Sequence, residues 1–231
     1  MALLLNIDTA TGTASLCLSL DGKVLGATEN ESQKDHAAWI QPAIQELLAQ
    51  HHYTLPQLQA IALSAGPGSY TGLRVGMATA KGLCFALQIP LITENTLKVI
   101  ANATREQVLL SGNGTADAGL LLCPMIDARR MEVFTAVYDQ QLNIVLAPAA
   151  MILDNISFNK ELVNNSILFT GNGSTKWKHV CDHPNARFAE VKHTAVHLAP
   201  LAEQSFLQEN FADLAYEEPF YLKEFYSYMK K

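Results

Sequence analysis

The first stretch with potential for chemistry is a glycine-rich turn at residues 66–76, GPGSYTGLRVG. It follows the apolar run 60–63 and precedes a helical pattern that ends near Leu87. Glycine permits backbone angles that other residues resist, and Ser69 and Thr71 offer hydroxyl groups to the first N–H groups of a helix. A helix N-terminus attracts anions, so the turn is compatible with a phosphate site. Its spacing matches neither the dinucleotide fingerprint nor the P-loop.

Small residues recur through the helix that this turn begins, at Gly72, Gly76 and Ala80. Each glycine inside a helix costs about 1 kcal/mol relative to alanine. Residues four apart share one helix face, so this face lets another backbone approach closely, either inside the fold or in a partner chain. Internal packing and partner binding both remain open from this helix alone.

Two aspartates occupy similar places in the two halves of the chain. Asp8 follows the first apolar strand, and Asp127 follows an apolar strand in the second half. Such carboxylates either hold magnesium or cap their own turns, as aspartate readily does. Neither has a glycine neighbour, which favours capping at both positions. A turn at 170–173, TGNG, carries Gly171 and Gly173 and suits a strand-to-helix connection.

Two histidine pairs have the spacing with which one helical turn can chelate zinc, namely His179 with His183 and His193 with His197. Pro184 directly follows the first pair, and neither pair forms a His-Glu-x-x-His arrangement. We therefore interpret all four as surface residues. The four cysteines are scattered and predict neither a zinc knuckle nor a disulfide framework.

The composition is that of a globular protein, with 231 residues, 49% hydrophobic content and a formal net charge of −6. The longest basic run is the Lys230-Lys231 pair, so no footprint for a phosphate backbone is visible in the sequence. The apolar run 2–5 is too short for a signal peptide, and no stretch approaches the roughly 20 apolar residues that span a bilayer. We expect a cytoplasmic protein.

Apolar periodicity predicts the elements that position these residues. The first half is predicted as three strands followed by alternating helices and strands, with strands at 3–9, 13–20, around 24–25, 60–65 and around 91–92, and helices at 35–50, 71–87 and 95–107. The second half repeats this opening, with strands at 120–126, 133–138, 144–146 and 167–169, and helical stretches at 154–164 and 197–209. The repetition predicts two like lobes that face one another across a cleft.

A polar, glycine-bearing break at 111–115, SGNGT, separates the two halves. We place the domain boundary there, which gives an N-terminal lobe of residues 1–110 and a C-terminal lobe of residues 111–231.

Three motifs together closely resemble the TsaB (YeaZ) family: residues 66–76, residues 7–11 (IDTAT) and residues 126–129 (IDAR). The resemblance covers the whole chain and implies an α/β protein with a duplicated actin-like ATPase (ASKHA) fold, in which each lobe has a mixed sheet and helices. It also implies a function. Bacterial proteins of this family are needed to place threonylcarbamoyl on N6 of adenosine 37 (t6A37) in tRNAs that read codons beginning with A.

The same resemblance implies an accessory, non-catalytic subunit that binds and activates a TsaD-type paralogue as a heterodimer, together with a TsaE-type ATPase. It implies a homodimer when the chain is alone, contact with tRNA only through the complex, and ATP or ADP only at the interface with the partner. Asp8, Asp127, Gly171 and Gly173 would then mark vestigial phosphate and adenosine positions.

In this family the first two N-terminal helices pair with the equivalent helices of TsaD or of a second TsaB. The corresponding contact residues here are Ile40, Ile44, Leu47, Leu48, Gly72, Arg74, Gly76 and Ala80. We expect Arg74 to make a contact at the helix pair or the domain junction, and Gly76→Leu to abolish association while the monomer stays folded. Residues 219–223, PFYLK, resemble the family's Tyr-Leu-Arg ending, with Lys223 in place of arginine.

An alternative from the enzyme class is an active ATP-dependent phosphotransferase or an M22-type metallopeptidase of the same fold. TsaD relatives bind a metal through His-x-x-x-His, whereas the corresponding stretch 94–101, ENTLKVIA, contains no histidine. We therefore predict no catalytic residue, no metal ligand and no cofactor for the chain alone.

Overall fold

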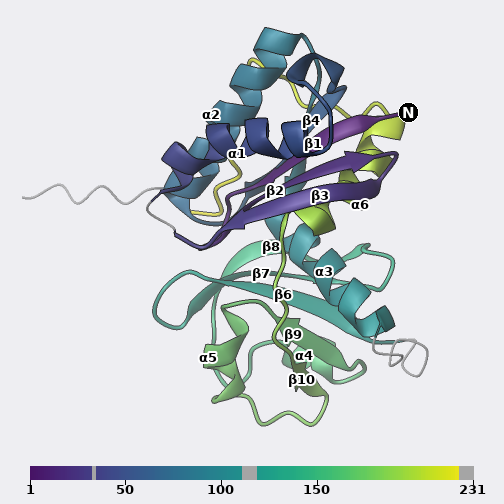
Figure 1. Cartoon of the computed structure of the whole chain (residues 1–231). Coiled ribbons are helices and arrows are strands. Elements are labelled where there is room, and N and C mark those ends of the chain that lie inside the picture. The colour runs from purple at the N-terminus through teal and green to yellow at the C-terminus, as the bar shows by residue number, and fades with distance from the viewer. Residues whose placement is uncertain (33–34, 111–118, 224–231) are drawn as a thin grey trace, which may run out of the picture.

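The computed structural model describes residues 1–32, 35–110 and 119–223, which form two lobes, each built on a five-stranded sheet (Figure 1). The first lobe contains β1 (Leu3–Asp8), β2 (Ala14–Leu20), β3 (Lys23–Asn30), α1 (His36–Gln50), the 3-10 turn η1 (Leu55–Gln57), β4 (Ala60–Gly66), α2 (Tyr70–Leu87), β5 (Leu91–Asn95) and α3 (Thr96–Leu110). The second contains β6 (Leu121–Asp127), β7 (Glu132–Tyr138), β8 (Ile144–Ile152), α4 (Asn159–Leu162), β9 (Ile167–Thr170), α5 (Ser174–Lys178), β10 (Ala186–Phe188) and α6 (Ala195–Leu207).

The two sheets have the same topology. The strand orders are β3-β2-β1-β4-β5 and β8-β7-β6-β9-β10. In each sheet the first strand pairs antiparallel with the second and parallel with the fourth. The predicted internal duplication is therefore confirmed strand by strand. The sequence prediction missed α5 and β10, which complete the repeat.

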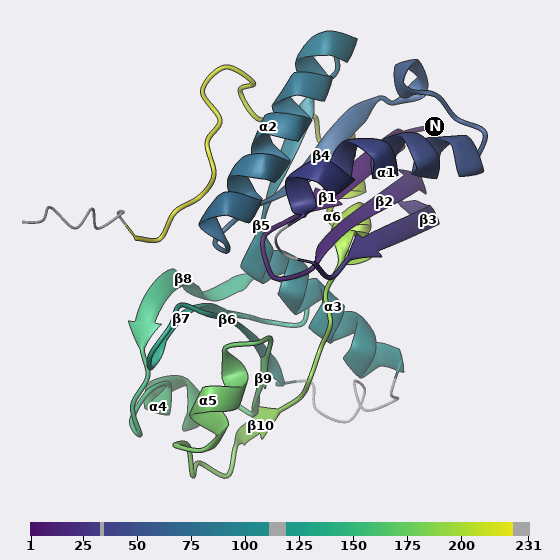
Figure 2. The same cartoon turned by 60° about the vertical axis from the view of Figure 1, so that its left-hand side comes forward.

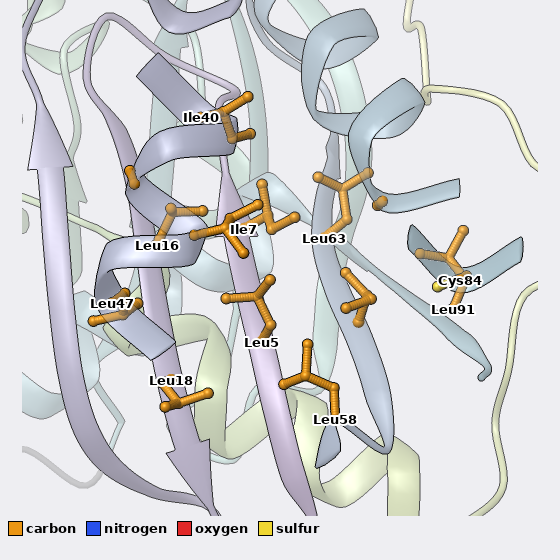
Figure 3. Packing of buried hydrophobic residues seen from close by; sticks show 14 of the residues in the cluster. Leu5, Ile7, Leu16, Leu18, Ile40, Leu47, Leu58, Leu63, Cys84 and Leu91 are labelled. Carbon is orange, nitrogen blue, oxygen red and sulfur yellow. The ribbon is translucent and has the colours of Figure 1, made fainter. Parts of the chain in front are cut away.

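Apolar side chains alternate between the two faces of the first sheet and create a core on each side. On one face, residues of β1 and β2 such as Leu5 and Leu16 pack against Ile40 and Leu47 of α1 and against α2 (Figure 3). The opposite face carries Leu4, which packs with α3 and α6. This second core also contains residues of β6 and β7, so it joins the lobes.

The helices cross between the lobes although the sheets do not. Helix α3 packs on β6, while α6 packs on the strands of the first sheet. The predicted division at 110/111 separates the two sheets but does not separate these helices. The break predicted at 111–115 lies outside the described residues.

After α6 the chain runs back beside α2 as an extended segment, residues 211–223, which we call the C-terminal strap (Figure 2). Its backbone bonds first to the edge strand β5, through Ala212 N–H and the Leu91 carbonyl at 2.8 Å. It then reaches the glycine turn, where Phe220 N–H donates to the Ala65 carbonyl at 2.7 Å. Within the described ranges, no helix has the length and apolar content needed to cross a membrane.

Candidate functional site

A cleft of about 800 Å³ lies between the lobes. Four segments line it: the turn after β1, the glycine turn that begins α2, the turn after β6 with Asn172, and the end of the C-terminal strap. The two aspartates singled out in the sequence stand at its edges, at the ends of the corresponding strands β1 and β6. The duplicated sheets thus bring Asp8 and Asp127 to equivalent places, as the repeat predicts.

Asp8 is 1% exposed, and both of its carboxylate oxygens are engaged. Oδ1 accepts the N–H of Ala10 at 3.0 Å, so the side chain caps its own turn as predicted. Oδ2 accepts the hydroxyl of Ser64 at 2.9 Å and lies 3.7 Å from Nε2 of His193. The carboxylate therefore ties the ends of β1 and β4 to the segment that precedes α6.

Asp127 also caps its own turn, with Oδ1 accepting the N–H of Arg129 at 2.6 Å, but its side chain is 46% exposed. Lys176 of α5 contacts the same oxygen at 2.8 Å and donates to two carbonyls of the turn. Burial opposes ionisation of Asp127, but the Lys176 ammonium and the Arg129 N–H outweigh it and lower the pKa of the carboxyl. Sequence reasoning missed Lys176, because nothing local to α5 points to the β6 turn.

The glycine turn forms the strand, turn and helix that the sequence predicts. Gly66 has φ +122°, and a side chain there would meet the Phe220 carbonyl at 2.5 Å. A side chain at Gly68 would overlap the carbonyl of Ala10. Ser69 caps α2 by accepting the N–H of Gly72 at 3.4 Å. The close approach that these glycines allow is therefore made by the chain's own β1 turn and strap.

The equivalent turn of the second lobe also packs on its own sheet. Gly171 has φ +84°, and a side chain there would overlap the Met125 carbonyl. Gly173 begins α5 against Ile126, and Asn172 Oδ1 accepts the N–H of Asp127 at 2.9 Å. These two glycines thus close the β9 turn over the end of β6.

The partner-contact residues predicted on α1 and α2 need correction. A side chain at Gly72 or Gly76 would overlap Thr9, and Ala80 is fully buried. The predicted α1 residues each show 2% exposure or less and belong to the first core: Ile40, Ile44, Leu47 and Leu48. Of the two alternatives that the small face leaves open, the structure shows internal packing. Gly76→Leu would therefore disturb the monomer rather than leave it folded.

The opposite face of the helix pair is open. On α2, Ala78 is exposed, a side chain at Gly82 would meet nothing within 4 Å, and Phe85 is 71% exposed. On the adjoining helix α1, Gln41 and Pro42 are exposed. We call these five residues the outer helix face. It carries no charge, and a large aromatic ring stands at its end, which are properties of binding surfaces.

Arg74 points to the C-terminal strap. Its Nε donates to the Tyr221 hydroxyl at 3.3 Å, and its Cζ lies 4.0 Å from the centre of the Tyr70 ring. The strap then crosses to the second lobe, where Lys223 pairs with Glu132. The lysine that replaces the family's arginine thus makes an ion pair with a single carboxylate across the cleft.

The histidines divide into two groups. His179 is exposed, whereas Nδ1 of His183 accepts the N–H of Asn185, and Nδ1 of His197 accepts the N–H that begins α6. His193 has a side chain only 12% exposed, so its prediction as a surface residue is wrong. Burial lowers the pKa of His193, Asp8 opposes this, and His197 adds to it. In the described ranges, no group of three potential metal ligands occurs.

Comparisons with known proteins agree with this architecture. Residues 23–223 match the family model described as TsaD, tRNA N6-adenosine threonylcarbamoyltransferase. A Bacillus subtilis protein named tRNA threonylcarbamoyladenosine biosynthesis protein TsaB is 28% identical over 226 residues, covering 95% of this chain and 93% of that protein. The Escherichia coli protein of the same name is 27% identical over 227 residues, with coverage of 95% and 94%.

Solved structures show the same fold. A Pseudomonas aeruginosa protein, described as uncharacterized with similarity to peptidase YEAZ, superimposes with a TM-score of 0.80 at 26% identity, covering 96% of this chain and all of that one. YeaZ from Pseudomonas aeruginosa gives a TM-score of 0.78 at 23% identity, with the same coverage. The predicted duplicated actin-like ATPase fold is thus confirmed. The chain belongs to the family described as TsaD, tRNA N6-adenosine threonylcarbamoyltransferase, and within it to the TsaB (YeaZ) proteins.

Proposed function

We propose that this chain is an accessory subunit for threonylcarbamoyl transfer to N6 of adenosine 37 in tRNAs that read codons beginning with A. The observation that carries the proposal is the family match over residues 23–223. Relatives named for threonylcarbamoyladenosine biosynthesis align with 95% of the chain. In this proposal the chain works in the cytoplasm, the compartment that a tRNA substrate implies.

The arrangement of the cleft supports an accessory role. Both oxygens of Asp8 accept hydrogen bonds from the chain itself, and Lys176 pairs with Asp127. The turns that would approach a nucleotide in an active relative are therefore held by internal contacts. The chain acts by binding and activating a TsaD-type paralogue together with a TsaE-type ATPase, and ATP or ADP binds only at the interface with the partner.

The outer helix face is the surface through which we propose that the paralogue binds. Its exposed, uncharged residues on α1 and α2 replace the buried set predicted from sequence. A helix pair can dock on another helix pair most closely where side chains are small, as at Ala78 and Gly82. The same face forms a homodimer when the chain is alone, and tRNA meets the chain inside the heteromeric complex.

A reconstituted reaction tests the function. The mixture contains a threonylcarbamoyl-AMP synthase, TsaD, TsaE, tRNA, ATP, threonine and bicarbonate, with and without this chain. We expect modified adenosine only when the chain is present, and no turnover by the chain alone. Modification at the same rate without the chain would contradict the accessory role. ATP turnover or peptide hydrolysis by the purified chain would instead support the phosphotransferase or metallopeptidase alternative.

A further inference from the structure

Aromatic rings collect at the cleft. Tyr70 of α2 and Phe220 and Tyr221 of the strap line it from the first lobe, and Phe134 of β7 lines it from the second. Phe220 and Tyr221 remain 43% and 39% exposed. Exposed aromatic rings at the wall of a cleft are the surfaces on which nucleic-acid bases stack, because every base has a π-face.

These rings are held in place by contacts on the strap. Arg74 stacks on Tyr70 and donates to the Tyr221 hydroxyl, and the two tyrosine ring centres lie 5.4 Å apart. The backbone N–H of Phe220 is bonded to β4. The platform is therefore formed before any ligand arrives, which reduces the entropy cost of binding.

Two arginines face the solvent directly across from this platform, in the turn between β6 and β7. Arg129 lines the cleft, and Arg130 is exposed next to it. Both have left-handed backbone angles, φ +72° and +50°, which asparagine or glycine adopts more easily. The acidic neighbours Asp127 and Glu132 are already paired, with Lys176 and Lys223 respectively. The two guanidinium groups thus give this turn a local positive charge in a chain whose net charge is −6.

We propose that the cleft binds an unpaired nucleotide of an RNA strand, with its base against Tyr221 and Phe220 and its flanking phosphates on Arg129 and Arg130. Recognition of single-stranded RNA combines base stacking on aromatic rings with cations along the backbone. Two free guanidinium groups in adjacent positions suit the successive phosphates of a strand. The inference rests on the proposed function, because it supplies a direct contact with the RNA inside the complex. Sequence analysis found no such footprint, since these residues come from four separate segments.

Binding of a short labelled RNA to the full chain tests this, measured by fluorescence anisotropy at several salt concentrations. The probes are a single-stranded heptanucleotide of mixed sequence, its duplex, and ATP as a competitor. Arg129→Asn with Arg130→Gly removes both cations and gives the turn the residues that it favours, so folding is preserved. Lys23→Asn with Lys160→Asn is the matched control, because it removes two exposed lysines elsewhere.

We expect the single strand to bind and the arginine double variant to weaken it about tenfold or more, with the salt dependence reduced by about 0.7 per lost phosphate contact. Tyr221→Leu is expected to weaken binding about fivefold or more, whereas Tyr221→Phe and the lysine control stay within about twofold of the wild type.

Three results would overturn the proposal: no binding of the single strand, equal binding of the duplex, or an equal loss in the lysine control. Complete displacement by stoichiometric ATP would also overturn it, since the site would then take a free nucleotide. The reconstituted reaction separates this proposal from the function. If modification requires the chain but the arginine double variant supports it fully, the RNA site is refuted and the accessory role stands.

Discussion

The two lobes share one strand order but differ in their helices. Helices α1 and α2 of the first lobe have 15 and 18 residues, whereas the equivalent α4 and α5 of the second have 4 and 5. The sheet is the part of the repeat that positions the two cleft turns, and it is kept in both lobes. The long helices occur only where an outer helix face is presented, which links helix length to binding rather than to the scaffold.

The cores differ accordingly. The first core is aliphatic, with leucine and isoleucine side chains from the sheet and both helices. In the second lobe, Phe158, Phe169 and Phe188 surround the fully buried Trp177 of α5, whose ring centre lies 4.6 Å from that of Phe169. A few large rings bury much area per residue, which is how a lobe with very short helices can fill its core.

The largest effect that would sharpen this comparison is expected from Trp177→Ala. It removes the centre of the aromatic cluster and leaves the carbonyl of Asp154 without its hydrogen bond from Nε1. We expect the free energy of unfolding to fall by about 3–5 kcal/mol in urea denaturation. Trp39→Ala on half-buried α1 is the control, with an expected loss of about 1–2 kcal/mol. Equal losses would show that the second lobe does not depend on its rings.

The equivalent aspartates provide the next comparison. Asp8→Ala leaves the buried Ser64 hydroxyl and the Ala10 N–H without their acceptor. We expect a loss of about 2–4 kcal/mol in the free energy of unfolding. Asp127→Ala removes an exposed ion pair and is expected to cost about 1 kcal/mol or less. Chemical denaturation of both variants checks the difference, and a costlier Asp127 variant would reverse our assignment of the buried anchor.

Two glycines on opposite faces of α2 give a smaller effect of opposite sign. Gly76→Ala places a methyl group against Thr9 and within 2.9 Å of Leu63, so we expect a loss of about 1–3 kcal/mol. Gly82→Ala enters open space and is expected to gain about 0.5–1 kcal/mol from helix propensity. Thermal unfolding of the pair measures both, and destabilisation by Gly82→Ala would mean that the outer face is not open.

The smallest effect concerns pH. Because burial lowers the pKa of His193, the folded chain holds it neutral while the unfolded chain takes up a proton below pH of about 6.5. Stability should therefore fall as the pH drops from about 6.5, by at most about 1.4 kcal/mol per pH unit for this one proton. His193→Asn should flatten the profile, while His179→Asn at an exposed site should leave it unchanged. A profile unaltered by His193→Asn would contradict the buried, neutral state.

Most of the fold could be predicted from local patterns. Helix α2 was expected over 71–87 and spans Tyr70–Leu87, because its glycine turn and apolar period mark both ends. Helix α5 and strand β10 were missed, since 5 and 3 residues are too few to show a period. Their place could have been inferred from the duplication, which requires a helix and a strand after β9.

The site was harder to predict because its contacts are long-range. Nothing in the sequence distinguishes Gly76 from Gly82, but the β1 turn covers one and leaves the other open. The contact of His193 with Asp8 joins opposite ends of the chain, and no pattern near His193 announces it. Capping by both aspartates was predictable because it depends only on the next two residues.

Association with a TsaD-type paralogue, measured by light scattering, tests most directly whether the long helices of the first lobe form the binding surface. Gly82→Arg places a large cation on the outer helix face without disturbing the fold, since open space surrounds this position. Lys160→Glu, on exposed α4, is the control in the second lobe. We predict that Gly82→Arg abolishes the heterodimer and Lys160→Glu retains it. A heterodimer of unchanged affinity with Gly82→Arg would contradict the account.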